Sequence, residues 1–399
     1  MSKSLTILSL VLFLFASCGE DRTYEYEEKT QGNHEMQSLM QEWYLWGDSL
    51  KELDWKQYFA SPTAFLPKLT SQSPNGYPWS YCSIDTIIAD YHTCGYFNHC
   101  DSYGLDITLM TDPTGETTKQ YARVLTVYPN SPAEQCGLQR GDFISQVGDA
   151  KMSKTVMSQL VSGRERTLVV SRLAVDADEI LYWTSTDTLQ LSRSRAVDVS
   201  TVMISRMLTP DVAYLMLTDL IDFTQISPSL SRLLTQSPSA LIIDLRLCNQ
   251  GSIDCAIELA NKIGNASGIM LRTIWNSRKS ANNTAYNISV ASGLDLYFIT
   301  SSYTQGAAEW LIYGLQSMQL ENIKIVGQAT AGQTVMLHPV PTVYQYTLYP
   351  AVAYVCNADG NHDYDSGIVP DDSFNEFDYV HLYPYGDIRE AVVSHILFD

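Results

Sequence analysis

Compact apolar runs alternate with helix-like segments through the second half of the chain. VAYLMLTDL (212–220) and ALIIDLRL (240–247) are continuous apolar stretches with the length of fully buried strands. The alternation continues with a helix-like segment at 252–263, a strand-like one at 294–300, a helix-like one at 306–318 and a strand-like one at 323–327. Buried strands separated by helices form a central sheet with helices packed on it. The sequence therefore predicts an α/β domain over residues 195–399.

The residues before this domain show a different, helical pattern. From Met36, large apolar side chains recur three and four residues apart at Leu39, Met40, Trp43 and Trp46. A second helix is predicted in SPTAFLPKL (61–69), with a serine as its cap and proline in its first turn. We expect a helical domain over 36–90. The polar stretch 19–35 is predicted to be a flexible linker.

Strand-like stretches follow, and one run among them is specific. The matching residues are Val127, Pro129, Ser131, Pro132, Ala133, Gly137, Leu138, Gly141, Asp142, Ile144 and Val147. This run resembles the V-x-P-x-S-P-A-x-x-x-G-L-x-x-G-D-x-I-x-x-V pattern of PDZ domains, which places such a domain at 91–175. The resemblance implies that Tyr103, Gly104, Leu105 and Asp106 form the loop whose backbone N–H groups hold a peptide C-terminus. A PDZ fold that only spaces other parts of the chain is the alternative.

Four segments of the α/β domain, in order, resemble the C-terminal processing peptidases, or tail-specific proteases. They are VAYLMLTDLIDF (212–223), LIIDLRLCNQGS (241–252), YFITSSYTQGAAEWL (297–311) and IVGQATAGQTV (325–335). YDSGIVPDDSF (364–374) resembles that family's G-I-x-P-D segment. The resemblance covers nearly all of residues 36–399. It implies a multidomain α/β fold with an N-terminal helical domain, a PDZ domain and a ClpP/crotonase-like core.

The same comparison shows where this sequence departs from the family. The position of the serine nucleophile holds Gly306, and the position of the lysine base, 27 residues later (333 minus 306), holds Gln333. A glycine has no side-chain oxygen, and a glutamine amide has no useful basicity. The loop that the resemblance assigns to the oxyanion hole reads Asn249, Gln250, Gly251, with side chains where the family has glycine. We expect a serine-peptidase fold with an inactive Ser–Lys centre and a reshaped oxyanion loop.

Other residues near the predicted Ser–Lys centre leave alternative functions open. Ser301, Ser302 and Thr304 precede the predicted helix, and Cys248 lies on the oxyanion loop. His338, five residues after Gln333, is a base in principle. An active serine-type endopeptidase with another nucleophile is therefore one alternative. A purely structural partner in an envelope complex is the other, whereas the leading hypothesis is a binder of peptides or unfolded protein C-termini.

The first residues predict export. One lysine precedes an apolar run from Leu5 to Phe15. This run is shorter than a typical membrane-spanning helix and is typical of a signal peptide. The small residues before Cys18 resemble the lipobox of bacterial lipoproteins, which implies a signal peptide at 1–18 and lipidation of Cys18. A plain signal peptide with an incidental cysteine is the alternative. Glu20 and Asp21 resemble the surface-export signals of Bacteroidetes lipoproteins. We expect a cell-envelope protein anchored by lipid to the outer membrane.

The composition limits the classes of ligand and partner that we expect. The net charge of −19 disfavours nucleic acid, because phosphates are repelled. Seven of the eight cysteines follow Cys18, an odd number that leaves at least one thiol free and does not assign pairs. YHTCGYFNHC (91–100) groups two histidines and two cysteines, but the spacing matches no zinc pattern. We predict no metal and no cofactor.

Overall fold

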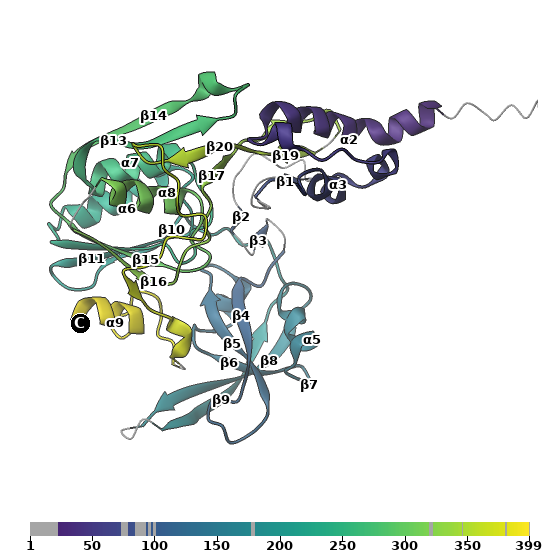
Figure 1. Ribbon diagram of the computed structural model, residues 1–399. Helices are drawn as coiled ribbons and strands as arrows, with labels where there is room; N and C mark the ends of the chain where they lie inside the picture. The colour runs from purple at the N-terminus through teal and green to yellow at the C-terminus, as the bar shows by residue number, and fades with distance from the viewer. Residues whose placement is uncertain are drawn as a thin grey trace, which may run out of the picture. The chain divides into compact units, whose positions relative to one another are not determined.

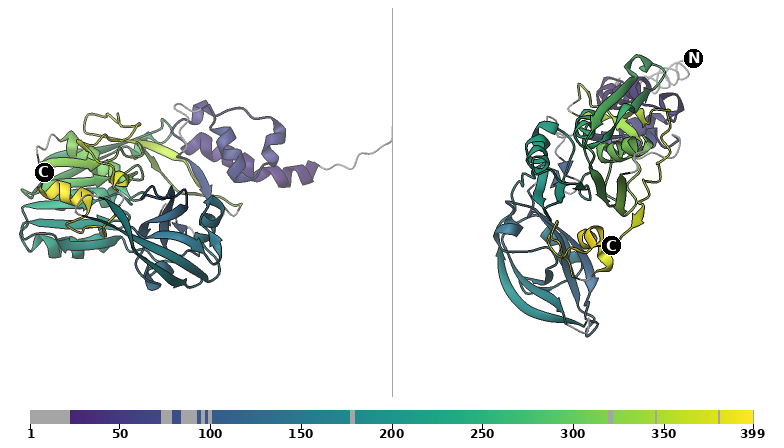
Figure 2. Two further views of the ribbon diagram at one scale, coloured as in Figure 1. Left: turned by 90° about the horizontal axis from the view of Figure 1, so that it is seen from below. Right: turned by 90° about the vertical axis from the view of Figure 1, so that its left-hand side faces the viewer.

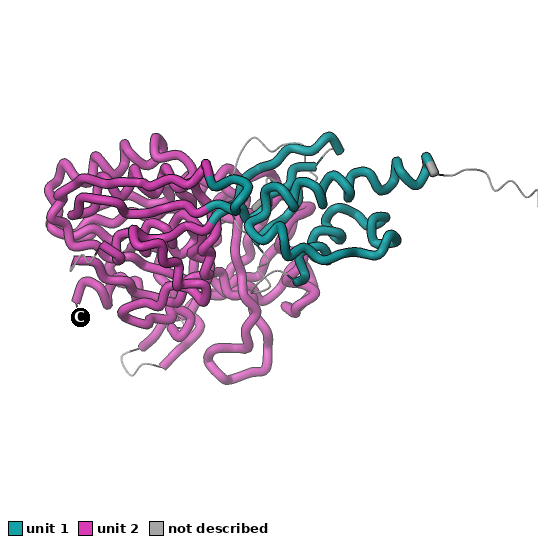
Figure 3. Tube along the Cα trace, turned by 45° about the horizontal axis from the view of Figure 1, so that its top comes forward, with its two compact units in different colours: residues 1–88, 275–280, 337–353 teal, residues 89–274, 281–336, 354–399 magenta. Residues whose placement is uncertain are grey.

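The computed structural model describes residues 23–72, 79–83, 93–94, 97–98, 101–176, 180–318, 322–344, 346–379 and 381–398. The chain divides into two compact units (Figure 3). Unit 1 contains residues 1–88, 275–280 and 337–353, and unit 2 contains residues 89–274, 281–336 and 354–399. Cys18 and the predicted signal peptide lie outside the described residues, as does most of 91–100. Within the described residues, no helix has both the length and the apolarity that a membrane crossing requires.

Unit 1 is built on one long helix. Its elements are α2 (Thr23–Trp43), η1 (Gly47–Ser49), η2 (Trp55–Phe59), α3 (Pro62–Leu69), and a sheet with strand order β1 (Tyr81–Ser83), β19 (Thr347–Tyr349), β18 (Val340–Pro341). Both helices predicted from the sequence are present, and Ser61 precedes α3. The prediction of a linker over 19–35 is wrong from Thr23 onward, because the helix begins there.

Polar residues on the buried face of α2 explain this error. Thr30 and Asn33 are buried in line with Met36 and Met40, at helical spacing. Asn33 Nδ2 donates to the carbonyl oxygens of Tyr58 and Ala60, both at 2.8 Å. An apolar periodicity therefore misses the first half of the helix, in which the buried residues are Thr30 and Asn33.

Two segments distant in sequence complete unit 1. Asn276 Nδ2 donates to the carbonyl oxygens of Glu42, Trp43 and Tyr44, at 3.0–3.1 Å, and so caps the C-terminal end of α2. The His338 ring stacks on Trp43, with 5.2 Å between ring centroids. His338 thus has a packing role in unit 1.

In unit 2, the region predicted to be a PDZ domain is a strongly paired sheet. Its elements are β4 (Leu105–Thr111), β5 (Gln120–Val127), α4 (Pro132–Gln135), β6 (Phe143–Val147), β7 (Ala150–Lys151), α5 (Lys154–Met157), η4 (Ser158–Leu160), β8 (Arg166–Val175) and β9 (Leu181–Leu191). The strand order is β4-β5-β6-β8-β9, with β7 on β6. β9 lies beyond the predicted end at 175 and makes the long hairpin with β8 that is visible in Figure 2.

The α/β core of unit 2 holds the expected central sheet. Its strand order is β10 (Val202–Met207), β11 (Val212–Leu217), β12 (Ala240–Asp244), β15 (Asp295–Thr300), β16 (Ile323–Gly327), β21 (Asp372–Ser373). β10 is antiparallel to β11 and the others are parallel. The helices are α6 (Phe223–Leu234), α7 (Ile253–Ile263), α8 (Ala307–Ser317) and α9 (Ala391–Phe398). A second sheet has the order β14 (Thr284–Ala291), β13 (Asn265–Trp275), β20 (Ala351–Cys356), β17 (Val335–Leu337).

Strand alternation assigns the two faces of the central sheet. Leu215 points into the core formed with α6, α7 and α8, whereas Tyr214 points into the core formed with α9. Figure 1 shows these helices on opposite sides of the sheet. The remaining short elements are β2 (Thr93–Cys94), β3 (Phe97–Asn98), η5 (Ser280–Asn282) and η6 (Glu376–Asp378). Because β12 and β15 are parallel, the loops that follow them leave the sheet at the same edge.

Candidate functional site

The site begins where β15 leads into α8. Gly306 occupies the N-cap position of α8 with φ 62° and ψ −119°, a conformation that side-chain-bearing residues rarely adopt. The preceding residues are tied to the loop after β12. Thr304 Oγ1 donates to the Leu245 carbonyl at 2.9 Å, and Gln305 N donates to the Cys248 carbonyl at 3.0 Å. The loops of β12 and β15 are thus held together at the start of the helix.

Buried Glu309 organises this junction. Its carboxylate accepts hydrogen bonds from Thr330 Oγ1 (2.5 Å) and from the backbone N–H groups of Gly332 (2.6 Å), Gln333 (2.8 Å) and Gly306 (3.0 Å). Burial raises the pKa of Glu309, and the hydrogen bonds oppose that shift. One side chain therefore joins the helix start to the loop after β16. This glutamate lies in the segment 297–311, but the family resemblance did not predict a role for it.

This junction brings Gly306 and Gln333 together. A Cβ placed on Gly306 would lie 3.4 Å from Gln333 Oε1, an ordinary contact distance. The Gln333 amide is already bonded on both sides. Its Oε1 accepts from Gln305 Nε2 at 2.7 Å, and its Nε2 donates to the Val335 carbonyl at 2.9 Å. Two neutral amides, those of Gln305 and Gln333, therefore lie bonded to each other beside Gly306.

The loop predicted to form the oxyanion hole lies against the same helix start. A Cβ on Gly251 would come within 2.6 Å of the Ala307 Cβ and 2.5 Å of the Leu220 carbonyl oxygen, so only glycine fits. The Gln250 carbonyl accepts from the backbone N–H of Leu220 at 2.9 Å. Asn249 Oδ1 is buried and has no hydrogen-bond partner among the described residues. The loop is close-packed, and its role in holding an oxyanion stays a prediction.

The alternative nucleophiles are held in structural contacts. Cys248 is fully buried, and burial raises the pKa of its thiol well above the usual value, which disfavours the thiolate. The Ser301 hydroxyl donates to the Arg246 carbonyl at 2.7 Å, and the Thr304 hydroxyl is used as described above. Ser302 is exposed. The hydroxyls of Ser301 and Thr304 donate to backbone carbonyl oxygens, so within the described residues neither donates to a side-chain base.

The PDZ loop differs from its prediction in one respect. Tyr103 N donates to the Val161 carbonyl at 3.3 Å, and Gly104 N donates to Ser102 Oγ at 2.9 Å. These two amides are therefore used inside the domain and do not point at a ligand. Burial raises the pKa of Asp106 to about 6, although the Tyr128 hydroxyl donates to its carboxylate. Leu105 begins β4, which lies at the edge of its sheet.

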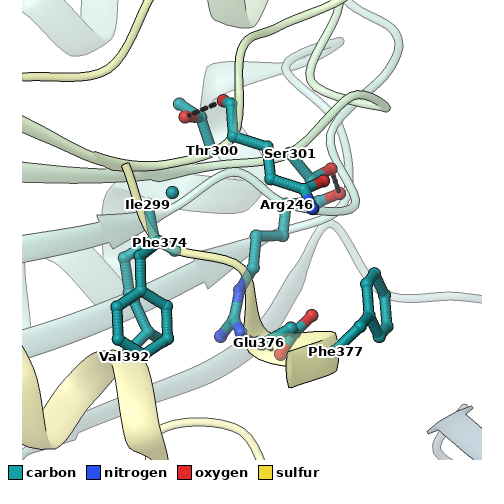
Figure 4. Close-up of a pocket in the computed structure, with 10 residues that line it drawn as sticks. Arg246, Ile299, Thr300, Ser301, Phe374, Glu376, Phe377 and Val392 are labelled. Carbon is teal, nitrogen blue, oxygen red and sulfur yellow. Dashed lines mark hydrogen bonds and ion pairs between the residues drawn. The ribbon is translucent and has the colours of Figure 1, made fainter. Parts of the chain in front are cut away.

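A small pocket lies at the ends of β12, β15 and β16, apart from Gly306 (Figure 4). Its cavity volume is about 20 Å³, and its lining includes Arg246, Ser301, Phe374 and Phe377. The Arg246 guanidinium is neutralised at 2.5 Å by Asp244, and at 2.7 Å by both Glu376 and Glu390. Because this charge is fully compensated, the pocket offers no free cation to a ligand.

Comparisons with known proteins give family matches for two segments of the chain and similar solved structures. Residues 211–374 match the model of peptidase family S41, and residues 123–172 match a PDZ domain. A Bacteroides fragilis protein assigned to the S41 proteases is 25% identical with a TM-score of 0.79, covering 90% of this chain and 95% of that chain. The photosystem II D1 C-terminal processing protease is 18% identical with a TM-score of 0.47, covering 86% and 92%. The curated proteins contain no significant match.

Proposed function

We propose that this chain, whose residues 211–374 match the model of peptidase family S41, is a catalytically inactive relative of the C-terminal processing peptidases that binds peptides or unfolded protein C-termini. The observation that carries the proposal is the meeting of Gly306 and Gln333 at the start of α8. Acyl transfer needs a nucleophile and a group that removes its proton near neutral pH. A Ser–Lys pair achieves this with a desolvated lysine of lowered pKa. Neither glycine nor a hydrogen-bonded amide supplies either role.

Peptide binding is proposed at the edge of β4 that has no neighbouring strand among the described residues. This strand pairs with β5 on one side and is the first strand of its sheet. An extended peptide adds to such an edge through main-chain hydrogen bonds. Because the amides of Tyr103 and Gly104 already bond within the domain, the terminal carboxylate contributes little. Recognition then rests on the strand and on side-chain contacts.

Calorimetry of extended peptides and their amidated twins tests this function. We expect a free C-terminus and its amide to bind with similar affinity, and mass spectrometry to recover both peptides intact. A strong preference for the free carboxylate would show that the loop at 103–106 opens to a ligand. Absence of binding across a broad peptide set would favour the structural-partner alternative, and cleaved peptide would favour the active endopeptidase.

A lipid anchor at Cys18 is proposed for localisation in the cell envelope, at the outer membrane. The short apolar run that ends in small residues before this cysteine supports it. We expect a palmitate analogue to label the wild-type chain in cells and to leave Cys18→Ala unlabelled. Equal labelling of the two proteins would exclude acylation at this residue and favour a plain signal peptide.

A further inference from the structure

Unit 1 exposes a group of aromatic side chains at the N-terminal end of α2. The exposed fractions are 50% for Tyr26, 63% for Trp55 and 38% for Phe59. We call these three residues the aromatic patch. Large rings left in water are costly, and Trp and Tyr at a surface combine an apolar body with a polar atom. The patch is therefore suited to a boundary between water and an apolar phase.

The patch is held by specific contacts between two elements. The ring centroids of Tyr26 and Phe59 are 5.8 Å apart in an edge-to-face arrangement, and those of Trp55 and Phe59 are 5.9 Å apart. The bonds from Asn33 fix η2 against α2, and Asp54 and Gln57 form a capping box at the start of η2. The rings therefore form one preformed surface that α2 and η2 share.

The position of the patch along the chain connects it to the anchor. α2 begins at Thr23, five residues after Cys18 (23 minus 18). Five residues span at most about 17 Å, even when fully extended at roughly 3.4 Å each. Figure 3 shows that the first turns of α2 form the free end of unit 1. An acylated Cys18 thus keeps this end of the unit within reach of the lipid surface.

We propose that the aromatic patch docks on the phospholipid interface of the membrane that holds the lipid anchor. Trp and Tyr side chains concentrate at the level of the lipid headgroups, where the ring is buried and its polar atom stays hydrated. The inference rests on the proposed anchor at Cys18. Docking adds a contact between unit 1 and the membrane beside the acyl anchor.

The charged residues near the aromatic patch indicate which class of lipid surface it binds. Glu25, Glu27 and Glu28 are exposed neighbours of Tyr26 along α2, Asp54 directly precedes Trp55, and Lys56 Nζ lies 5.7 Å from the centroid of the Trp55 ring. Carboxylates are repelled from an anionic surface and tolerate a zwitterionic one. The partner is therefore a zwitterionic phospholipid interface. A second copy of the chain on the same rings is the competing occupant.

Bromolipid quenching tests the proposal on the acylated full-length protein. Vesicles of zwitterionic phosphatidylcholine with brominated acyl chains quench tryptophans that reach the interface. We expect quenching in the wild type, loss of most of it in Trp55→Phe, and a marked reduction in the double variant Tyr26→Ala, Phe59→Ala. Tyr182→Ala, which removes a tyrosine of similar exposure (47%) in unit 2, should quench like wild type.

The outcomes separate the patch from the anchor. Equal quenching of wild type and Trp55→Phe, with both proteins bound to the vesicles, would overturn the patch and leave the anchor standing. Protein that is not acylated and stays in solution would overturn the anchor. Concentration-dependent dimers that Trp55→Phe or the double variant abolishes, together with no bromolipid quenching, would assign the rings to a second copy.

Discussion

Replacing Glu309 by alanine should lower the free energy of unfolding by about 4 kcal/mol, because it leaves several buried donors without a partner. The carboxylate accepts from three backbone N–H groups and one hydroxyl at the start of α8 and in the loop after β16. An unpaired buried donor costs roughly 1–3 kcal/mol. Urea unfolding followed by circular dichroism measures the change. Of the changes considered, this one has the largest expected effect on stability.

Glu258→Ala is the matched control, because Glu258 is an exposed glutamate on the neighbouring helix α7. Its substitution should change the free energy of unfolding by no more than about 0.5 kcal/mol. Glu309→Gln should fall between the two, since one carbonyl oxygen remains to accept. A Glu309→Ala protein as stable as the control would mean that the loop at 330–333 finds other acceptors, and that the junction does not depend on the carboxylate.

The double variant Gly306→Ser, Gln333→Lys should gain slow peptide hydrolysis, whereas each single variant should have none. A serine without a base is a poor nucleophile, and a base without a nucleophile has no target. A Cβ at position 306 has room, with its nearest neighbour 3.4 Å away. The conformation at φ 62° and ψ −119° costs a side-chain-bearing residue roughly 1–3 kcal/mol, so part of the gain is lost to strain.

The restored rate should stay well below that of a normal enzyme. The resemblance implies glycine in the family where this chain has Asn249 and Gln250, and one missing oxyanion donor costs about 10²–10³-fold in turnover. Adding Asn249→Gly and Gln250→Gly should raise the rate further. Single-turnover assays with a fluorogenic peptide measure each step. Hydrolysis by Gly306→Ser alone would show that a base other than residue 333 serves the site.

The α/β core was predictable because its strands are buried on both faces. Continuous apolar runs such as residues 240–243 predict a central strand, and the apolar residues of the segments between these runs have helical spacing. The meeting of Gly306 and Gln333 was also implied, since the family's motifs recur in order. The resemblance did not give the role of Gln305, which lies in the segment 297–311 and whose side-chain amide donates to Gln333.

The errors have local causes. The start of α2 was missed because Thr30 and Asn33 face the interior, so the buried face is not apolar there. Unit 1 also contains Asn276 and His338, which contact the C-terminal end of α2 from more than 200 residues away in the sequence. Hydrogen bonds and ring stacking between residues so far apart produce no periodic pattern in the sequence. The assignment of residues 103–106 as a peptide-binding loop stays a prediction. The amides of Tyr103 and Gly104 are engaged by Val161 and Ser102, which a motif cannot show.

Incubation of the purified wild-type chain with unfolded casein and with tailed peptides, followed by mass spectrometry, tests the central claim most directly. Because Gly306 and Gln333 provide neither nucleophile nor base, we predict intact substrates and no labelling by a serine-directed fluorophosphonate. Robust proteolysis by the wild type, abolished by changing Cys248, Ser302 or Thr304, would contradict the account and establish an active peptidase with a different nucleophile.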